Sequence, residues 1–363
     1  MSGGCGSRMG GATLADQLTH RDGPLTPTRG RVLVTTGWLG PGDEVDRYLT
    51  GAGLQVVHGS IRERERRGRT LSDVVGSVDA IVAGTEHIGR EVFEAAPRLR
   101  VIGRTGVGHD NVDVVAATAH GVAVCPTPGV NRQSVAEHTM GLLLGLARGI
   151  PQNVASVRAG RWEQPSGREL AGATLGVVGL GAIGRLVAGL AQAFGMRVVA
   201  HDPAIDRAYA AEHDIGVREL PRLLNESDFV SLHLFLSPET RHLLDAKAFA
   251  LMKPGAFVIN TARGGIVDED ALADALASGR LGGAAMDTVG TEPLPPDSPL
   301  RSFDNVLVTA HIGAATEESR ARSGLMAARS VLTVLRGGRA EHTVNPEYAK
   351  LRDRARPHGA ARR

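Results

Sequence analysis

Six residues near the middle of the chain, Gly179-Leu180-Gly181-Ala182-Ile183-Gly184, constrain the fold more than any other segment. They form a GxGxxG pattern between a β-branched apolar run at 174–178 and an apolar helical pattern at 183–194. In a strand–turn–helix unit of this kind, the first glycine permits a tight turn, the second lets a phosphate approach the backbone, and the third lets helix and strand pack closely. The segment therefore predicts a parallel sheet with a dinucleotide site at the start of the helix.

The next predicted strand ends at Asp202, 18 residues after the last glycine. A carboxylate at this place accepts hydrogen bonds from the ribose hydroxyls of the adenosine half and repels a 2′-phosphate. Ala182 and Ile183 lie where the free N–H groups of a helix favour an anion. We therefore predict NAD as the cofactor; His201 and Arg207 leave NADP open, and a glycine turn without a ligand is the structural alternative.

The remaining sequence continues the same alternation of short apolar runs and helical patterns, which indicates βαβ units. Of the 363 residues, 42% are hydrophobic, so a large core is expected; a net charge of +2 and 3% aromatic residues argue against a nucleic-acid partner. Two cysteines, the lack of a leader pattern and the lack of an unbroken apolar span predict a cytoplasmic protein with no membrane segment.

Strands are predicted at 32–35, 54–57, 79–82, 99–102, 122–125, 174–178, 197–201, 229–234, 256–260, 283–287 and 306–309.

These elements predict an α/β fold of two doubly wound parallel-sheet domains, Rossmann-like or flavodoxin-like, with a cleft between them. Residues 31–126 and 316–348 are expected to form a substrate-binding domain, and residues 127–315 the NAD-binding Rossmann domain. Residues 1–30 are predicted to be a disordered tail, and residues 349–363 a basic tail.

Two segments bear on assembly. An apolar helix is expected at 135–147, with apolar residues on most of its faces, and a polar connector holding Trp162 is expected at 148–170. A helix of this kind is typical of an interface. Together with the family resemblance given below, on which the expectation depends equally, these segments suggest a homodimer.

Three later segments carry polar residues at or beyond predicted strand ends: Asn260–Asp268 (NTARGGIVD), Asp287–Pro293 (DTVGTEP) and His311–Thr316 (HIGAAT). The Arg263 guanidinium suits a carboxylate, which it binds through two parallel hydrogen bonds. His311 is a side chain that exchanges protons near neutral pH, and Glu292 is suited to orient the imidazole. Because ligands bind at the carboxyl ends of parallel strands, these three residues are the predicted catalytic group. The structural alternatives are a surface turn, a buried histidine and a loop charge.

The three motifs resemble those of the D-isomer-specific 2-hydroxyacid dehydrogenases, and the likeness extends over residues 32–348, including Gly106–Asp113 and Ser134–His138. Within this family the chain is most similar to short 3-phosphoglycerate dehydrogenases. The resemblance implies an NAD-dependent oxidoreductase that transfers a hydride between the nicotinamide and C2 of a small D-2-hydroxy acid or 2-keto acid. The acid is expected to be 3-phosphoglycerate-like or a phosphonate or phosphinate analogue, and no metal is expected.

The resemblance also implies the contact residues. Those expected at the cofactor are Gly179, Gly181, Ala182, Ile183, Gly184, Asp202, Leu234, Thr240, Thr261, Ala262, Arg263, Asp287, His311, Gly313 and Ala314. Those expected at the substrate are Ala83, Gly84, Arg104, Gly106, Val107, Gly108, Arg263 and His311.

The sequence departs from the family pattern at two positions. Phe235 stands where a proline is usual, and Ala83 stands where the phosphoglycerate enzymes often carry an arginine for the distal phosphate. Two further functions on the same fold are alternatives: oxidation of a non-carbon centre, as in phosphite dehydrogenases, and NAD(H) sensing by a corepressor-like binding protein.

Overall fold

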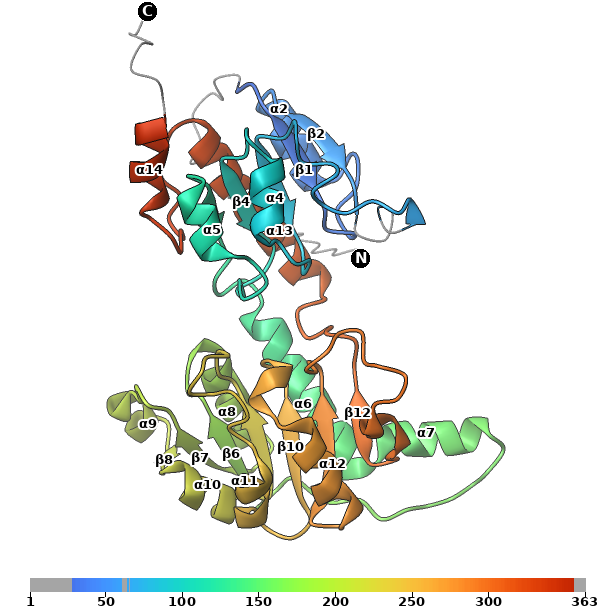
Figure 1. Cartoon of the computed structure of the whole chain (residues 1–363). Coiled ribbons are helices and arrows are strands. Elements are labelled where there is room, and N and C mark those ends of the chain that lie inside the picture. The colour runs from blue at the N-terminus through green and yellow to red at the C-terminus, as the bar shows by residue number, and fades with distance from the viewer. Residues whose placement is uncertain (1–27, 61–63, 65, 356–363) are drawn as a thin grey trace, which may run out of the picture. The chain divides into compact units, whose positions relative to one another are not determined.

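The computed structural model describes residues 28–60, 64 and 66–355, and the chain divides into two compact units. The first unit extends to Thr127 and resumes at Gly324, and the second comprises Pro128–Ser323. Each unit contains one parallel β-sheet with a buried apolar cluster on each face, which confirms the predicted fold class (Figure 1). The predicted domain boundaries were residues 126 and 315; the second crossing in the structure lies later, inside the helix α13 (Glu317–Leu335).

The first unit is a five-stranded sheet with helices against it. Its strands are β1 (Arg31–Val34), β2 (Gln55–His58), β3 (Ala80–Ala83), β4 (Val101–Arg104) and β5 (Ala123–Cys125), and its helices are α2 (Glu44–Gly51), α4 (Arg90–Ala95), α5 (Val114–Ala119), α14 (Tyr348–Ala355) and the later part of α13. All strands are parallel, in the order β2-β1-β3-β4-β5. Leu325 and Val331 of α13 pack with Val32 and Val82, so this helix covers one face of the sheet.

The second unit is a seven-stranded parallel sheet. Its strands are β6 (Thr174–Val178), β7 (Arg197–His201), β8 (Gly216–Val217), β9 (Phe229–Leu232), β10 (Ala256–Asn260), β11 (Leu281–Met286) and β12 (Val306–Val308). The order is β12-β11-β10-β9-β6-β7-β8, so the chain leaves β6 toward one edge and returns at β9 on the other side. Ligands bind at the carboxyl ends of strands beside such a reversal, and the glycine turn follows β6 directly.

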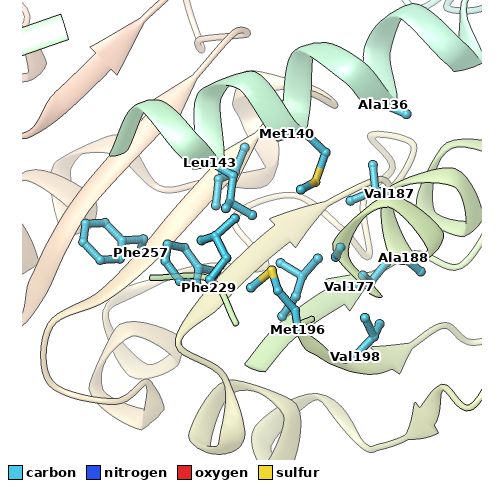
Figure 2. Close-up of a cluster of buried hydrophobic side chains, with 14 of the residues drawn as sticks. Ala136, Met140, Leu143, Val177, Val187, Ala188, Met196, Val198, Phe229 and Phe257 are labelled. Carbon is cyan, nitrogen blue, oxygen red and sulfur yellow. The ribbon is translucent and has the colours of Figure 1, made fainter. Parts of the chain in front are cut away.

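The helices of the second unit are α6 (Arg132–Arg148), α7 (Ile150–Arg158), α8 (Ala182–Ala193), α9 (Arg207–Glu212), α10 (Leu220–Glu226), α11 (Ala246–Leu251) and α12 (Glu269–Ala277), with short 3-10 turns η1 (Gly264–Ile266) and η2 (Pro299–Ser302). Figure 2 shows Met140 and Leu143 of α6 in the same core as Val177 of β6 and Phe229 of β9. The rings of Phe229 and Phe257 stack with centroids 5.1 Å apart. This core fixes the strand that precedes the glycine turn.

Several predicted elements differ from the structure. The expected polar connector at 148–170 contains the helix α7, and the expected basic tail from 349 begins as α14. The rest of that tail beyond Ala355, and most of the predicted tail at 1–30, lie outside the described residues. Among the described residues, the structure contains no helix with the length and apolar character needed to cross a membrane.

Candidate active site

The glycine turn connects β6 to α8, and two of its glycines are required by close contacts. Gly179 has a φ of +99°, and a Cβ there would lie 2.5 Å from the His233 carbonyl oxygen. A Cβ on Gly184 would lie 2.0 Å from the Gly179 carbonyl oxygen, so only glycine lets α8 start this close to β6. A Cβ on Gly181 meets nothing within 4 Å, so the backbone there faces open space.

The N-terminus of α8 is suited to an anion. Gly181 is the N-cap and, as glycine, offers no side-chain acceptor to the first N–H groups of the helix, among them those of Ala182 and Ile183. These donors and the helix dipole favour a phosphate group. The open backbone at Gly181 and the uncapped helix start therefore fit the pyrophosphate of a dinucleotide.

Asp202 follows β7 and hydrogen-bonds to the glycine turn itself. Its Oδ2 accepts a hydrogen bond from Leu180 N at 2.8 Å, and its Oδ1 accepts one from Ala204 N at 2.8 Å. A carboxylate has about four acceptor positions, so both oxygens retain capacity for a ribose hydroxyl. The sequence predicted the ribose role alone; the structure adds that Asp202 fixes the turn.

His311 and Glu292, both predicted to be catalytic, lie side by side. His311 Nδ1 is 2.9 Å from Glu292 Oε2, and the two side chains are 34% and 39% exposed, so the pair is reachable from solvent. His311 has a φ of +53°, a left-handed conformation that is uncommon for residues other than glycine. Its N–H donates to the carbonyl oxygens of Asp287 and Thr309, both at 2.9 Å, which holds the backbone in this conformation.

Arg263 follows β10, and its loop packs against the loop of Glu292. Asn260 holds that loop, because its Nδ2 donates to the Arg263 carbonyl oxygen at 2.8 Å. A Cβ on Gly264 would lie 1.9 Å from the Val289 carbonyl carbon, so the two loops are in direct contact. Arg263, Glu292 and His311 follow β10, β11 and β12, which are neighbours in the sheet, at its carboxyl edge.

Asp287 lies directly after β11 and organises the segment that carries His311. Only 2% of the residue is exposed. Its Oδ1 accepts hydrogen bonds from Thr309 Oγ1 at 2.6 Å and Ile312 N at 2.8 Å and lies 3.2 Å from His138 Nε2, and its Oδ2 accepts one from Gly313 N at 2.8 Å. The segment from Thr309 to Gly313 is therefore wrapped around one buried carboxylate. The sequence did not predict this role for Asp287 or any role for His138.

Burial by itself raises the pKa of Asp287, but hydrogen bonds from His138, Thr309 and two backbone N–H groups outweigh it and lower the pKa to about 2. A pKa that is lower in the folded state than in the unfolded chain, where it is about 3.9, stabilises the fold above that value. This contribution is lost as the pH falls through the folded-state pKa.

Asp287→Asn is accordingly expected to lower the free energy of unfolding most above about pH 4, with the difference from wild type shrinking between about pH 4 and pH 2. Denaturant unfolding measured across this pH range checks the prediction. Asp297→Asn, which changes an exposed carboxylate in a loop, is the matched control. A difference of the same size at every pH would contradict the assignment.

Other residues expected at the cofactor lie along the same edge of the second sheet. Thr261 is buried, and its Oγ1 is 2.9 Å from Thr139 Oγ1. Thr240 Oγ1 donates to the Phe235 carbonyl oxygen at 2.7 Å and accepts from Ser237 N at 2.8 Å, so it shapes the turn beyond β9. Phe235 itself is 78% exposed and packs into no core. Leu234, Ala262 and Ala314 are partly buried, and Gly313 is buried.

The residues expected at the substrate in the first unit follow β3 and β4 at the carboxyl edge of that sheet. Ala83 is fully buried and Gly84 is partly buried. Arg104 is 5% exposed, and its Nε and Nη2 donate to the Gly108 carbonyl oxygen at 3.3 and 3.1 Å. Thr127 N donates to the Gly106 carbonyl oxygen at 3.0 Å. The local hydrogen bonds from Arg104 and the long-range one from Thr127 therefore shape the loop between Gly106 and Gly108.

No group of three or more His, Cys, Asp or Glu side chains within the described part of the chain is arranged to hold a metal ion.

Comparison with known proteins identifies relatives of both units. Residues 140–313 match the family model described as D-isomer specific 2-hydroxyacid dehydrogenase, NAD binding domain. The D-3-phosphoglycerate dehydrogenase of Methanocaldococcus jannaschii is 45% identical over 280 residues, which are 76% of this chain and 53% of that protein. The chain thus spans about half the length of this relative. The TT0316 protein of Thermus thermophilus has a crystal structure that matches with a TM-score of 0.77 and 38% identity, over 86% of this chain and 99% of that one.

A second relative, whose length is closer to that of this chain, matches over most of its own sequence. The glyoxylate reductase of Thermofilum pendens is 40% identical over 306 residues, which are 82% of this chain and 90% of that protein. NAD, the cofactor predicted from the glycine turn and Asp202, is the cofactor of the matched domain family. With this identity over nine-tenths of a relative, and a family model matching the unit that holds the glycine turn and the His311–Glu292 pair, the chain belongs to the D-isomer-specific 2-hydroxyacid dehydrogenase family.

Proposed function

We propose that the protein is an NAD-dependent dehydrogenase that transfers a hydride between the nicotinamide and C2 of a small D-2-hydroxy acid or 2-keto acid. The observation that carries the proposal is the 2.9 Å contact between His311 Nδ1 and Glu292 Oε2, on the same sheet edge as the glycine turn. A histidine oriented by a carboxylate is suited to exchange a proton with a substrate hydroxyl.

This contact supports one ring nitrogen of His311 as the atom that exchanges the proton. Glu292 accepts a hydrogen bond from Nδ1–H of His311, so Nε2 is the nitrogen that gives or takes the proton of the C2 oxygen. When the imidazole is protonated, the adjacent carboxylate stabilises its positive charge. His311 then acts as the acid in reduction of a keto acid and as the base in oxidation of a hydroxy acid.

Arg263 supplies the fixed positive charge. Its planar guanidinium can bind the carboxylate of the acid through two hydrogen bonds and polarise the C2 oxygen. The cofactor, when bound, accepts or supplies the hydride. Gly179, Gly181, Gly184 and Asp202 are proposed to hold it, together with Ala182, Ile183, Leu234, Thr240, Thr261, Ala262, Arg263, Asp287, His311, Gly313 and Ala314.

Residues of the first unit are also proposed to bind the substrate. Ala83, Gly84 and Arg104, with the loop of Gly106, Val107 and Gly108, follow strands of that unit at the edge where ligands of parallel sheets bind. The backbone N–H groups of this loop are suited to bind a small acid.

Consumption of NADH with a panel of 2-keto acids tests the proposed function. We expect turnover with at least one of glyoxylate, hydroxypyruvate, pyruvate and 2-ketoglutarate. Tight NADH binding without turnover of any of them would contradict the proposal and favour a binding protein on the same fold.

Asp202→Ala is expected to weaken NADH binding by at least about tenfold, because it removes hydrogen bonds to a charged acceptor, and to relax discrimination against NADPH. Titration of both nucleotides by fluorescence measures the two effects. Asp202→Asn is the matched control, since it retains an acceptor for Leu180 N but removes the charge. An unchanged preference between the nucleotides in both variants would exclude Asp202 from the ribose site.

A homodimer is proposed, through the second of the two segments that the sequence indicated, the connector at 148–170 that holds Trp162. The long helix α6 packs Met140 and Leu143 inside its own unit. Exposed apolar residues lie instead on α7, where Ile150, Val154 and Val157 are 50%, 42% and 43% exposed, and at Trp162, which is 82% exposed. Their spacing on α7 places the three helical residues on one face.

We expect a solution mass of twice that of the chain, measured by sedimentation, and dissociation by Val154→Glu. Phe194→Glu, at another exposed apolar residue of the same unit, is the control and should leave the mass unchanged. A monomeric wild type would contradict the proposed dimer.

A further inference from the structure

The helix α6 presents polar side chains to the loops that carry the proposed catalytic residues. Ser134 Oγ lies 2.9 Å from Thr316 Oγ1, and Thr139 Oγ1 lies 2.9 Å from Thr261 Oγ1. His138 is four residues after Ser134, so these two side chains lie on the same face of the helix. All five residues belong to the second unit. Polar contacts from one helix therefore reach both the loop after β10 and the loop after β12.

His138 contacts the segment that carries His311. Its Nε2 lies 3.2 Å from both Asp287 Oδ1 and Thr309 Oγ1. A Cβ built on Gly313 would lie 3.6 Å from His138 Cδ2, so the imidazole also lies beside the other end of the segment. The imidazole is therefore next to both ends of the stretch from Thr309 to Gly313.

The hydrogen bond from His138 connects Asp287 to a different part of the unit. The other donors to this carboxylate belong to the Thr309–Gly313 segment that wraps around it, whereas His138 belongs to a helix whose apolar side is buried in the core (Figure 2). Because Asp287 is only 2% exposed, solvent has little access to replace a lost donor. His138 therefore fixes the carboxylate, and the segment around it, relative to α6.

The backbone of His311 depends on the same two residues that His138 contacts. His311 has a φ of +53°, and its N–H donates to the carbonyl oxygens of Asp287 and Thr309, both at 2.9 Å. A residue other than glycine persists in the left-handed region only where its surroundings hold it there. The residues that hold His311 by their main chains are thus held by His138 through their side chains.

We propose that His138 is a positioning residue for the reaction. By bonding to Asp287 and Thr309, it keeps His311 in the orientation in which Nδ1 meets Glu292 and Nε2 exchanges the proton. The inference rests on the proposed function, in which His311 is the acid–base group. In this proposal His138 touches no reacting atom and acts through the segment alone. A displacement of a catalytic group by about 1 Å can lower the rate by about 100-fold.

His138→Phe gives the first test, because it keeps a planar ring and removes the N–H donor. We expect kcat, measured with a 2-keto acid that the wild-type enzyme reduces, to fall by about 10- to 100-fold. The dissociation constant of ADP-ribose, which lacks the nicotinamide, should stay within about twofold of wild type, since the glycine turn and Asp202 lie on other loops.

Two further variants accompany this measurement. His138→Gln retains an N–H donor on a side chain of similar reach, and should recover most of the lost kcat. Glu137→Gln changes the exposed neighbouring residue on α6, and is the matched control that should leave kcat unchanged.

A double variant separates positioning from a general loss of structure. If His138 acts through His311, adding His138→Phe to His311→Ala should change the residual kcat by less than about twofold, because the group that it positions is already absent. A substitution that merely loosened the unit or the cofactor site would lower kcat by the same factor in both backgrounds.

The outcomes separate this inference from the proposed function. A folded His138→Phe variant with the kcat of wild type would overturn the role of His138 and leave the dehydrogenase assignment intact. An equal loss of kcat with and without His311 would do the same. If His138→Phe does not fold, His138→Ala takes its place with the same expected results. Turnover of no 2-keto acid by the wild-type protein would overturn both proposals.

Discussion

Replacing His311 with alanine is expected to lower kcat by about two to four powers of ten, the range typical of a lost general acid–base group. The affinity for NADH should fall far less than kcat, because the glycine turn and Asp202, which are proposed to bind the pyrophosphate and the ribose, lie on other loops of the sheet. Steady-state kinetics measure kcat, and fluorescence titration measures the NADH dissociation constant. His213→Ala, at an exposed histidine in the same unit, is the control.

Whether the substitution of His311 changes kcat or KM decides the role of this residue. A group that acts only in the transition state changes kcat, whereas one that holds the acid equally in both states changes KM. If His311→Ala raised KM and left kcat near wild type, another group would carry the proton. Glu292→Gln should lower kcat less than His311→Ala, because the imidazole stays in place but loses the carboxylate that stabilises its charge.

Gly184→Ala is expected to produce the largest effect on the cofactor site. The new Cβ would lie 2.0 Å from the Gly179 carbonyl oxygen, so α8 must move away from β6. We expect a loss of about 1–3 kcal/mol in unfolding free energy, as for other overpacked contacts, and NADH binding weakened by at least about tenfold. Thermal unfolding and NADH titration measure the two effects together.

Two other glycines of the same segment provide matched controls. Gly189→Ala lies on α8 in open space, and should raise stability slightly without changing NADH affinity. Gly181→Ala also meets no protein atom, so the fold should tolerate it, but its Cβ faces the proposed pyrophosphate and should weaken NADH binding. If Gly184→Ala and Gly189→Ala behaved alike, the close helix–strand contact would have no functional role.

Local patterns predicted most of the fold. Every strand expected from the sequence is present within two residues of its predicted ends. The helix α14 was missed because its sequence is short and polar, and α7 because it has only nine residues, so periodicity gave little signal in either. β8, with two residues, is too short for any pattern to indicate.

In the candidate site, too, local patterns predicted some residues, and the packing of the folded chain determines others. The chemistry of Arg263, Glu292 and His311 could be predicted because each residue type suits one task and each follows a predicted strand. The bonds of Asp287 to His138 depend on how α6 packs against β11 and β12, which spacing along the chain does not reveal.

The division of the first unit into two chain segments has a consequence for synthesis on the ribosome. Strands β1 to β5 emerge before the second unit, whereas the part of α13 that covers one face of their sheet emerges after it. At about 5–20 residues per second, the intervening segment takes roughly ten to forty seconds to be made. During that interval Val32 and Val82 lack their covering helix, so the nascent first unit exposes an apolar surface that chaperones recognise, while the contiguous second unit is free to fold first.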